Sequence, residues 1–415
     1  MPFSKTVVLK SLVMIEIVLV VILQSKILNR ERRMVPTSAQ MQNKRDFITR
    51  EKESRWKRCK RLISGEEKVN RTSITKNNNS KILDLYKPFE DCDHILHSRF
   101  THPKVTAGEE ANLPIAYGFT IYKGASLFDR ILRAIYMPHN VYCIHIDKKS
   151  PEFFYRAIKA IIRCLPNVFI AAKRIDVVWG DISLVQAQLE CMRELLESTV
   201  KWKYYISLIG QDFPLYENNE IVAALKMLNN TNSIEGIPMP EHFKHRIKHV
   251  SKSRGRRTLI KISPPPQNVS IYKGSTHIVA IRDFVRFVLY SKVGKDFIKF
   301  LKDTYVPDET IYASLQQHPL APGGIPGNQP RKISRALRWI NSKRKHGMEC
   351  HGIWVRDLCW IHVKDLRWVL GKKMKSKLFV HKIPFKFPED LIECILVARM
   401  ERKYGSALWE EKINK

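Results

Sequence analysis

The chain has 415 residues, of which 44% are hydrophobic. This is enough for one large domain or two ordinary ones with a real core, and it excludes a disordered or fibrous protein. Lysine and arginine number 72 against 40 acidic residues, which gives a formal net charge of +32. Such a bias is typical of proteins with an anionic partner, such as nucleic acid, membrane headgroups, acidic glycans or nucleotide phosphates, and it does not choose among them.

The apolar segment from Thr6 to Leu23 is a candidate membrane anchor. As a helix its 18 residues would reach about 27 Å, just enough to cross a hydrocarbon layer. Glu16 near its middle costs free energy unless it is protonated or paired. A cleaved signal peptide is the alternative, but no small-x-small pattern follows Leu23. We therefore expect a cytoplasmic tail at 1–5, a signal-anchor at 6–23, a polar stem at 24–90 and the main domain at 91–415.

The charges around this segment leave its orientation open. Lys5 and Lys10 precede its middle, but more basic residues follow it, so the positive-inside rule taken alone disfavours a lumenal main domain. Four Asn-x-Ser/Thr sequons, by contrast, are usable only in a lumenal or extracellular chain. They begin at Asn70, Asn78, Asn229 and Asn268. Together with eight cysteines, an even number, they favour the secretory pathway.

Beyond Cys92, short apolar runs alternate with stretches of helical period, which is typical of an α/β sheet. The predicted buried strands are Val141–Ile146, Asn167–Ala171 and Tyr204–Ile209. Between them, the predicted helices are Ser126–Met137, Pro151–Arg163 and one that Asp181 caps. Ligands of such sheets bind at the carboxyl ends of the strands, which directs attention to Asp147 and to the segments 179–181 and 210–214.

Four segments of this part resemble one known family. They are Arg133–Ser150, Tyr204–Tyr216, Asp303–Gln316 and Gly352–Trp360. In order and spacing, residues 90–405 are similar to the core 2 and I-branching β-1,6-N-acetylglucosaminyltransferases. The resemblance implies a single-pass type II Golgi membrane protein with a lumenal catalytic domain of GT-A-type fold, a Rossmann-like mixed sheet flanked by helices. It also implies inverting transfer of GlcNAc from UDP-GlcNAc to the 6-hydroxyl of a sugar on an O-glycan acceptor.

The resemblance also assigns all eight cysteines to disulfides. The implied pairs are Cys59–Cys394, Cys92–Cys164, Cys143–Cys191 and Cys350–Cys359. The alternative, buried free cysteines in a reducing compartment, fits poorly with the sequons and the anchor.

Inverting transfer requires a base for the attacking hydroxyl and positive groups for the departing diphosphate. The base that the resemblance implies is Glu309, in the segment TYVPDET. On the motif alone, Glu309 reads instead as an ordinary acid in the first turn of a helix that follows Pro307. We expect the adjacent Asp308 to cap that helix.

A divalent metal is not expected. Many nucleotide-sugar transferases hold a metal between an Asp-x-Asp pair and the diphosphate, but the only such triplet here is Asp91-Cys92-Asp93. It precedes the predicted strands and its cysteine is assigned to a disulfide, so we interpret it as surface structure. After the strand that ends at Ile146 there is only Asp147, followed by two lysines.

Without a metal, fixed cations must offset the charge that develops on UDP. The matching positions are Arg356, whose planar fork suits phosphate oxygens, and Lys382, a compact charge. A solvated surface cation is the alternative for either residue.

For the uracil and ribose end of the donor, the resemblance points to Thr120, Asp147 and Trp179. Core packing explains Trp179 almost as well. Asp212 belongs to a matched motif too, either as a ligand or as a turn cap.

On the acceptor side the resemblance implies Glu235, Arg246 and Trp339. The sequence departs from the family pattern here, because Phe243 stands where a basic residue is expected and Asn341 where a tyrosine is expected. These changes put the identity of the acceptor in doubt. The core 1 O-glycan Galβ1-3GalNAc is the first choice.

The basic charge exceeds what one diphosphate requires, because eight Lys or Arg lie between Lys244 and Lys261 with no acid among them. A solvated basic surface is the simplest interpretation, and attraction to sialylated or sulfated acceptors is a second. Nucleic acid is not an expected partner, since no binding motif appears. Two other functions stay open: a non-catalytic glycan-binding relative, and a transferase that uses another donor such as UDP-xylose.

Overall fold

The computed structural model describes residues 54–67, 91–100, 108, 110–252, 256–327, 332–340, 349–386 and 389–404. The predicted tail and anchor, most of the predicted stem and the sequons at Asn70 and Asn78 lie outside these ranges. Within the ranges, no helix combines the length and the apolar character that a membrane span requires. Residues 61–415 belong to one compact unit, which is the part considered below.

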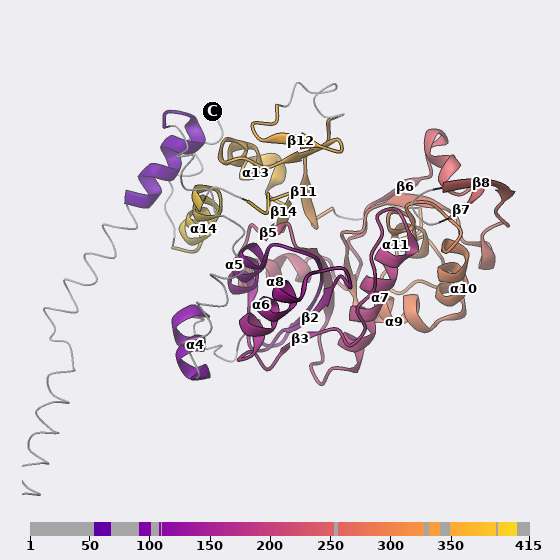
Figure 1. Cartoon of the computed structure of the whole chain (residues 1–415), viewed down its shortest axis with the longest axis horizontal. Helices are drawn as coiled ribbons and strands as arrows, with labels where there is room; N and C mark the ends of the chain where they lie inside the picture. The colour runs from indigo at the N-terminus through magenta and orange to yellow at the C-terminus, as the bar shows by residue number, and fades with distance from the viewer. Residues whose placement is uncertain are drawn as a thin grey trace, which may run out of the picture. The chain divides into compact units, whose positions relative to one another are not determined.

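A five-stranded sheet forms the centre of this unit (Figure 1). Its strand order is β10-β4-β1-β2-β3, in which the first four strands of the sequence run parallel and β10 pairs antiparallel with β4. The strands are β1 (Ile115–Ile121), β2 (Val141–Ile146), β3 (Val168–Ile170), β4 (Tyr204–Ile209) and β10 (Val279–Ile281). Nearly every residue of β1, β2 and β4 is buried, as expected for a parallel sheet covered on both faces.

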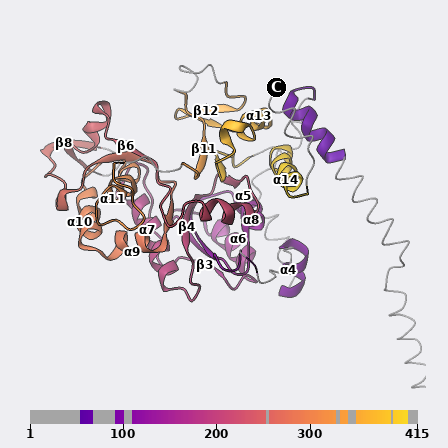
Figure 2. The same ribbon diagram turned by 180° about the vertical axis from the view of Figure 1, so that it is seen from behind.

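Helices cover the two faces of the sheet. On one face, α7 (Ile182–Glu197), α9 (Arg282–Tyr290) and α10 (Lys292–Leu301) enclose the main hydrophobic core. On the other face α5 (Ala125–Ile135) packs with α6 (Glu152–Ile162), and the ring of Phe128 meets that of Phe119 in β1 at 5.4 Å. Two further helices are α4 (Cys92–Arg99) and α8 (Asn218–Lys226). The view from behind shows α6 and β3 together, apart from α9 and α10 (Figure 2).

The predicted α/β organisation is confirmed. All three predicted strands form, with the second shortened to Val168–Ile170, and helices form in each predicted interval. Asp181 caps α7 as expected, because its carboxylate accepts a hydrogen bond from the backbone N–H of Ser183 at 3.0 Å. Asp91 accepts from the N–H of Asp93 at the exposed start of α4, which agrees with the interpretation of that triplet as surface structure.

Smaller elements surround the central sheet. A three-stranded sheet has the order β11-β14-β5, and three two-stranded pairs are β12–β13, β6–β9 and β7–β8. These strands are β5 (Asp212–Pro214), β6 (Gly236–Pro238), β7 (His249–Lys252), β8 (Arg256–Lys261), β9 (Tyr272–Gly274), β11 (Arg335–Leu337), β12 (Ile353–Val355), β13 (Leu358–Trp360) and β14 (Phe379–His381). The remaining helices are η2 (Glu241–Arg246), η4 (Pro266–Asn268), η5 (Pro307–Glu309), α11 (Ile311–Gln316), η6 (Val363–Asp365), α13 (Leu366–Val369), η7 (Lys372–Met374) and α14 (Glu389–Tyr404).

Three disulfides link parts of the fold, and they are pairs that the resemblance implies: Cys92–Cys164, Cys143–Cys191 and Cys350–Cys359. Cys59 and Cys394 are also disulfide-bonded, and none of the cysteines described is free. The pairing of Cys59 with Cys394 stays a prediction. The sequon asparagines Asn229 and Asn268 are both exposed.

Candidate active site

Glu309 lies in the short turn η5, immediately before α11. Two backbone hydrogen bonds fix the segment that leads into this turn: the N–H of Tyr305 donates to the carbonyl of Arg246 at 2.9 Å, and the N–H of Val306 donates to the carbonyl of Gly180 at 3.0 Å. Val306 has φ of 54°, a left-handed conformation that a β-branched residue rarely adopts. Such strained backbone often accompanies a functional site.

The Glu309 carboxylate is held by two cations through one oxygen. Arg246 donates to Oε2 at 2.6 Å, and the Nζ of Lys273 lies 3.5 Å from the same atom. The side chain of Glu309 is 22% exposed, so the pair is neither fully buried nor freely solvated. Oε1 makes no hydrogen bond to any residue that the structure describes, and it is therefore the oxygen open to an incoming hydroxyl.

Lys273 was missed by the sequence analysis. It lies in β9, directly across from Ile237 of β6, about 30 positions from either of its charged neighbours in the chain. Phe243 lies between the two cations, with Arg246 4.1 Å and Lys273 5.8 Å from the centre of its ring. The expected basic residue is absent at position 243, but Lys273 of β9 brings a positive charge beside the ring of Phe243.

The expectation that Asp308 caps a helix is wrong. Asp308 lies inside η5, and the caps assigned to η5 and α11 are Val306 and Thr310. Asp308 is 8% exposed, and its Oδ1 has no hydrogen-bond partner among the residues that the structure describes. Burial, together with the negative charge of Glu309, raises the pKa of Asp308 to about 7. Asp308 is buried, whereas the adjacent Glu309 stays partly exposed.

Arg356 occupies the tip of the β12–β13 hairpin. It forms the two-residue turn with Asp357, and their φ values of 49° and 64° are those of a type I′ turn. The guanidinium of Arg356 lies 5.4 Å from the centre of the Trp179 ring, whose edge contacts Tyr305 with the ring centres 5.9 Å apart. Trp179 is 60% exposed, so the core-packing alternative for this residue is wrong.

Gly180 joins the Trp179 region to the turn of Glu309. Its φ of 75° favours glycine, and a Cβ at this position would lie 2.8 Å from the ring of Tyr305. The close approach lets the Gly180 carbonyl accept from Val306, as described above. Arg356, one of the cations predicted for the diphosphate, is thus connected to the turn of Glu309 through Trp179, Gly180 and Val306.

Lys382 follows β14 and lies close to Arg356. The backbone N–H of Ile361, just after β13, donates to the carbonyl of Lys382 at 3.0 Å, which ties the hairpin of Arg356 to this strand. Burial, reinforced by the charges of Arg356 and Lys123, lowers the pKa of Lys382. Lys123, just after β1, was missed by the sequence analysis because a single exposed lysine in a loop carries no motif. Three cations therefore gather where the resemblance predicts a diphosphate.

Thr120 and Asp147 lie at neighbouring strand ends. Thr120 is a buried residue near the end of β1, and Asp147 directly follows β2, with its N–H donating to the carbonyl of Ile121 at 2.9 Å. The Asp147 carboxylate accepts from the N–H of Lys149 at 2.9 Å and lies 3.4 Å from that lysine's Nζ. Neither side chain forms a hydrogen bond or ion pair with Arg356 or Lys382, so the structure brings these two groups near the same edge without joining them.

The residues predicted for the acceptor fall into two groups. Arg246 pairs with Glu309, and Glu235, 3.5 Å from the Nζ of Lys377, immediately precedes β6, the strand paired with that of Lys273. Trp339 lies elsewhere, in a bridge with Leu358 beside the hairpin of Arg356, and is 42% exposed. Asn341 lies outside the described residues.

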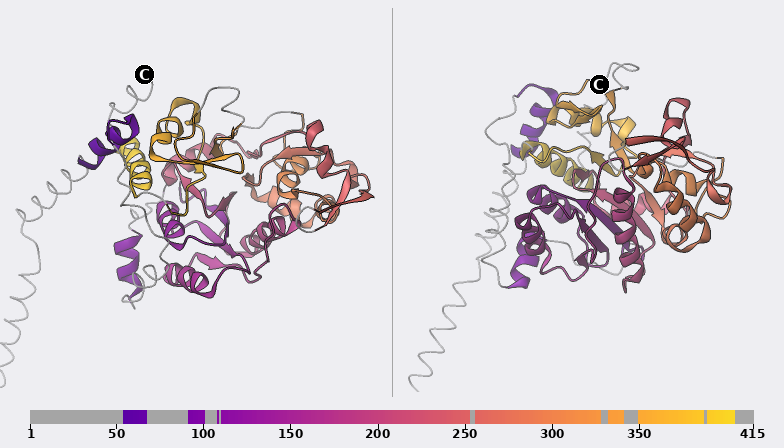
Figure 3. Two further views of the ribbon diagram at one scale, coloured as in Figure 1. Left: turned by 45° about the horizontal axis from the view of Figure 1, so that its top comes forward. Right: turned by 45° about the vertical axis from the view of Figure 1, so that its right-hand side comes forward.

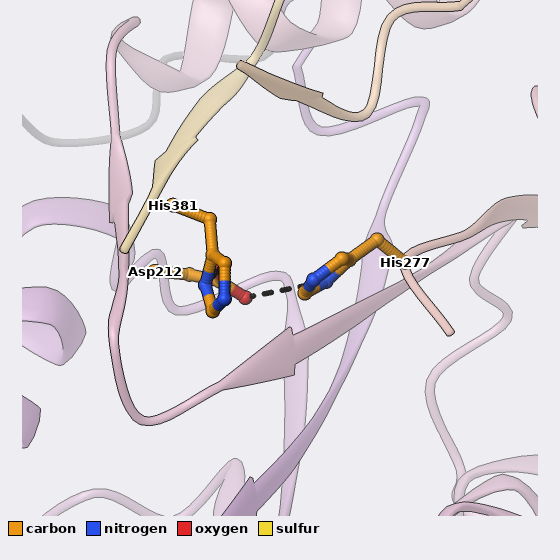
Figure 4. A group of neighbouring side chains, drawn as sticks. All are labelled: Asp212, His277 and His381. Atoms are coloured by element: carbon orange, nitrogen blue, oxygen red, sulfur yellow. Dashed lines mark hydrogen bonds and ion pairs between the residues drawn. The ribbon is translucent and has the colours of Figure 1, made fainter. Parts of the chain in front are cut away.

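Asp212 joins several strands in a buried network (Figure 4). Its carboxylate accepts from the N–H of Ile209 at 2.7 Å, from Arg335 at 3.0 Å and from the Nδ1 of His381 at 2.9 Å, and His277 lies 3.8 Å away. Burial alone would raise the pKa of Asp212, but Arg335, His277 and the hydrogen bond from His381 together outweigh it and hold this pKa well below its usual range. Asp212 is therefore an organising charge inside the fold, and its turn-capping role is the one that the geometry supports.

Asp212, His277 and His381 are also a group that could hold a metal ion by type and spacing. Burial lowers the pKa of both histidines, which keeps them neutral as metal binding requires. However, the carboxylate already accepts three hydrogen bonds, and the guanidinium of Arg335 would repel a cation at the same oxygen. The residues therefore fit a self-contained ion and hydrogen-bond network better than a metal centre. In the other such group, Cys350 and Cys359 form a disulfide.

The site thus combines a carboxylate with one open oxygen, a connected group of cations and an exposed tryptophan, at the carboxyl edge of a parallel sheet. This arrangement is that of an α/β transferase whose leaving group is anionic. Residues 115–370 match the family model described as Core-2/I-Branching enzyme. The chain belongs to this family, and its fold is of the GT-A type.

Individual relatives agree with this assignment. A human β-1,3-galactosyl-O-glycosyl-glycoprotein β-1,6-N-acetylglucosaminyltransferase 3 is 37% identical over 375 residues, covering 84% of each chain. A human N-acetyllactosaminide β-1,6-N-acetylglucosaminyl-transferase is 38% identical over 301 residues, covering 71% of this chain and 74% of the relative. Among solved structures, apo mouse xyloside xylosyltransferase 1 matches with 12% identity and a TM-score of 0.28, over 50% of this chain and 82% of that one.

Proposed function

We propose that the protein transfers GlcNAc from UDP-GlcNAc to a 6-hydroxyl of an O-glycan acceptor, with inversion, and so makes a β-1,6 branch. Family membership supports the reaction, and both human relatives described above are named as β-1,6-N-acetylglucosaminyltransferases. The observation that carries the mechanism is the connection between two groups of charges. The Glu309 turn bonds through Val306 to Gly180, next to the tryptophan that Arg356 covers.

Glu309 is the base in this mechanism. Its Oε1 takes the proton of the acceptor 6-hydroxyl as the oxygen attacks the anomeric carbon of the donor, while Oε2 stays bonded to Arg246. Arg246 and Lys273 are positioning groups that hold the carboxylate in one orientation. Together with Glu235 they line the side from which the acceptor approaches.

Arg356 and Lys382 bind the diphosphate and stabilise the charge that develops on it when the glycosidic bond to UDP breaks. Lys123 adds a third charge to this group. Thr120, Asp147 and Trp179 bind the nucleoside end. With fixed cations supplying this stabilisation, transfer requires no divalent metal.

Golgi localisation follows from the same proposal. Residues 6–23 anchor the protein in the Golgi membrane as a single-pass type II protein, and the disulfide-bonded domain lies in the lumen, where Asn229 and Asn268 are exposed to glycosylation. The core 1 disaccharide Galβ1-3GalNAc is the proposed acceptor.

A transfer assay with the full chain tests the proposal. The protein is incubated with UDP-GlcNAc and an array of O-glycan and polylactosamine acceptors, with and without chelator, and the linkage of each product is determined. A β-1,6-linked GlcNAc on the core 1 disaccharide, formed equally in EDTA, is expected. Activity that is lost in EDTA and restored by manganese contradicts the metal-free mechanism. Activity only with UDP-xylose changes the donor, and tight glycan binding without transfer makes the protein a lectin-like relative.

A further inference from the structure

The β7–β8 hairpin carries a basic surface that the reaction above does not use. Four exposed cations lie on it or directly beside it: Lys248, Lys252, Arg256 and Lys261. None of the four makes an ion pair with any acid in the part of the chain that the structure describes. Lys252 and Arg256 face each other across the two strands, where like charges repel unless an anion lies between them. We call β7, β8 and these four cations the basic hairpin.

The basic hairpin is bonded to the segment that carries the proposed base. The N–H of Ser251 in β7 donates to the carbonyl of Asp303 at 2.8 Å, and the N–H of Tyr305 donates to the carbonyl of Arg246. Arg246 in turn pairs with Glu309. β8 lies at the outer edge of the group formed by β6, α10 and α11 (Figure 1), and the red ribbon of this region lies at the right-hand margin in the left view of Figure 3. A ligand on the hairpin would therefore lie on the acceptor side of the site.

The hairpin also exposes apolar side chains, because Leu259 is 96% and Ile260 is 64% exposed. These residues are neighbours in β8, so their side chains point to opposite faces of the hairpin. A surface that enters a bilayer needs its apolar groups on one face. The basic hairpin therefore fits an extended acidic polypeptide better than a bilayer. Such a polypeptide can present carboxylates to the cations and apolar side chains to Leu259 or Ile260.

We propose that the basic hairpin binds an acidic stretch of polypeptide that flanks the glycosylated residue of the acceptor glycoprotein. This inference rests on the proposed function, because it assigns the hairpin to the same acceptor. It gives the four cations of the basic hairpin a partner, and it selects among glycoproteins that carry an identical glycan. The hairpin contacts the protein part of the acceptor while Glu309 contacts the sugar.

Two glycopeptides test the proposal. They carry the same core 1 disaccharide and differ only in flanking residues, which are Asp and Glu in one and Asn and Gln in the other. The full chain is expected to bind the acidic glycopeptide about tenfold more tightly in fluorescence anisotropy, and to show a similar ratio of kcat/KM. The double variant Lys252→Glu with Arg256→Glu is expected to lose this preference and to keep its activity on the free disaccharide. A preference that survives in this variant, or is absent from the wild type, overturns the proposal.

A matched control uses the same charge change on α6, with Arg156→Glu and Lys159→Glu, both exposed residues. This variant is expected to keep the preference. If charge reversal disturbs folding, the neutral double variant Lys252→Gln with Arg256→Gln takes its place. It is expected to show a partial loss of the preference for the acidic glycopeptide. An anionic lipid surface is the competing partner for the basic hairpin, and vesicles that contain phosphatidylserine test it. The proposal is overturned if the hairpin variants lose vesicle binding but keep the preference for the acidic glycopeptide. Binding of the glycopeptides is measured without the donor, so it does not depend on transfer. A failure of the proposed function is seen separately, as the absence of transfer to the free disaccharide.

Discussion

Glu309 contacts Arg246 and Lys273 through one carboxylate oxygen, Oε2, and leaves the other oxygen without a protein cation among the residues described. This asymmetry determines the expected effect of a substitution at Glu309. Glutamine keeps a carbonyl oxygen for Arg246 but removes the negative charge and the ability to take a proton. We expect Glu309→Gln to lower kcat for transfer by about 10²- to 10⁴-fold, the usual contribution of a general base. UDP binding, measured by calorimetry, is expected to stay close to that of the wild type.

Glu241→Gln is the matched control for this substitution. Glu241 lies in η2 near Arg246 in sequence, but it is exposed and pairs only with Lys244 at 2.6 Å among the residues described. The control is expected to transfer GlcNAc normally. Retained activity in Glu309→Gln would remove Glu309 from the role of base.

Lys382 gives UDP binding a dependence on pH. Its pKa lies below the ordinary lysine value of 10.5 because of burial and the nearby charges of Arg356 and Lys123. The negative diphosphate raises this pKa again when it binds, so binding takes up a proton between the two values. We expect the affinity for UDP to fall as pH rises through the lowered pKa of Lys382, before ordinary lysines lose their charge. Calorimetry from about pH 7 to about pH 10, in buffers of different ionisation heat, measures both the affinity and the proton uptake.

Arginine keeps its charge over this range, so Lys382→Arg is expected to bind UDP with much less dependence on pH. Lys299→Arg on α10, away from the cations named above, is the control and should follow the wild type. An alkaline loss of affinity that is the same in all three proteins would place its origin in another group.

At the scale of elements, the short β12–β13 hairpin presents Arg356 and is held by the Cys350–Cys359 disulfide. We expect Cys350→Ser with Cys359→Ser to weaken UDP binding about fivefold, because ordering the loosened hairpin costs on the order of 1 kcal/mol upon binding. The loss of stability is expected to be about 3 kcal/mol for a loop of this length. Calorimetry and chemical denaturation measure the two effects.

The Cys92–Cys164 disulfide provides the converse case. It joins α4 to the chain after α6 across 72 residues, a longer loop whose release costs about 4 kcal/mol of stability. Its removal is expected to leave UDP binding unchanged. Equal losses of UDP affinity in the two double variants would mean that the β12–β13 disulfide acts only through overall stability.

Periodicity predicted the helices α5, α6 and α7 and three of the parallel strands, because the apolar spacing in these helices follows directly from the faces they bury. It did not identify α4, α8, α9, α10 or α14. It missed β1, whose Gly118 lowers strand propensity. The fold requires this glycine, since a Cβ there would lie 2.4 Å from the hydroxyl of Tyr205. A packing requirement between two strands cannot be read from either strand alone.

The candidate site was predictable only where the family resemblance supplied positions. Lys273 and Lys123 approach Glu309 and Lys382 from distant strands and loops, and no local pattern marks them. The Arg246–Glu309 pair joins residues 63 positions apart in sequence. The spacing of residues in a sequence predicts which of them lie on the same face of one helix or strand. The contacts named here depend instead on how separate helices, strands and loops pack together.

For the whole molecule, three basic residues lie in the interior as parts of buried ion pairs, although the net charge of the chain is +32. Arg335, Arg338 and Arg399 are each less than 5% exposed. They pair with Asp212, Asp365 and Glu217 at 3.0, 2.7 and 2.9 Å. Breaking one partner of such a pair leaves a buried charge uncompensated, so these arginines are structural. Each of these pairs is neutral, so the three buried arginines add nothing to the net charge. The interpretation of the basic excess as a solvated surface stays a prediction.

Asp308 links stability of the whole fold to pH. Its pKa is raised to about 7 from 3.8, so the folded protein keeps a proton that the unfolded chain has already lost between about pH 4 and about pH 7. Stability from this group is therefore fully present below pH 4 and is lost as pH rises through 7. Asp308→Asn removes the titration, and we expect its advantage over the wild type in the free energy of unfolding to grow across this range to a few kcal/mol.

Denaturation by urea at several pH values measures this difference. Asp303→Asn, which changes an exposed acid in the same segment, is the control and should follow the wild type at every pH. The carboxyl of Asp308 is buried beside Glu309, and its Oδ1 lacks a hydrogen-bond partner among the residues described. Burial of an unpartnered carboxyl favours its protonated, neutral form. Parallel stability curves for Asp308→Asn and the wild type would mean that Asp308 is ionised in the folded protein, with its unpartnered oxygen satisfied by water.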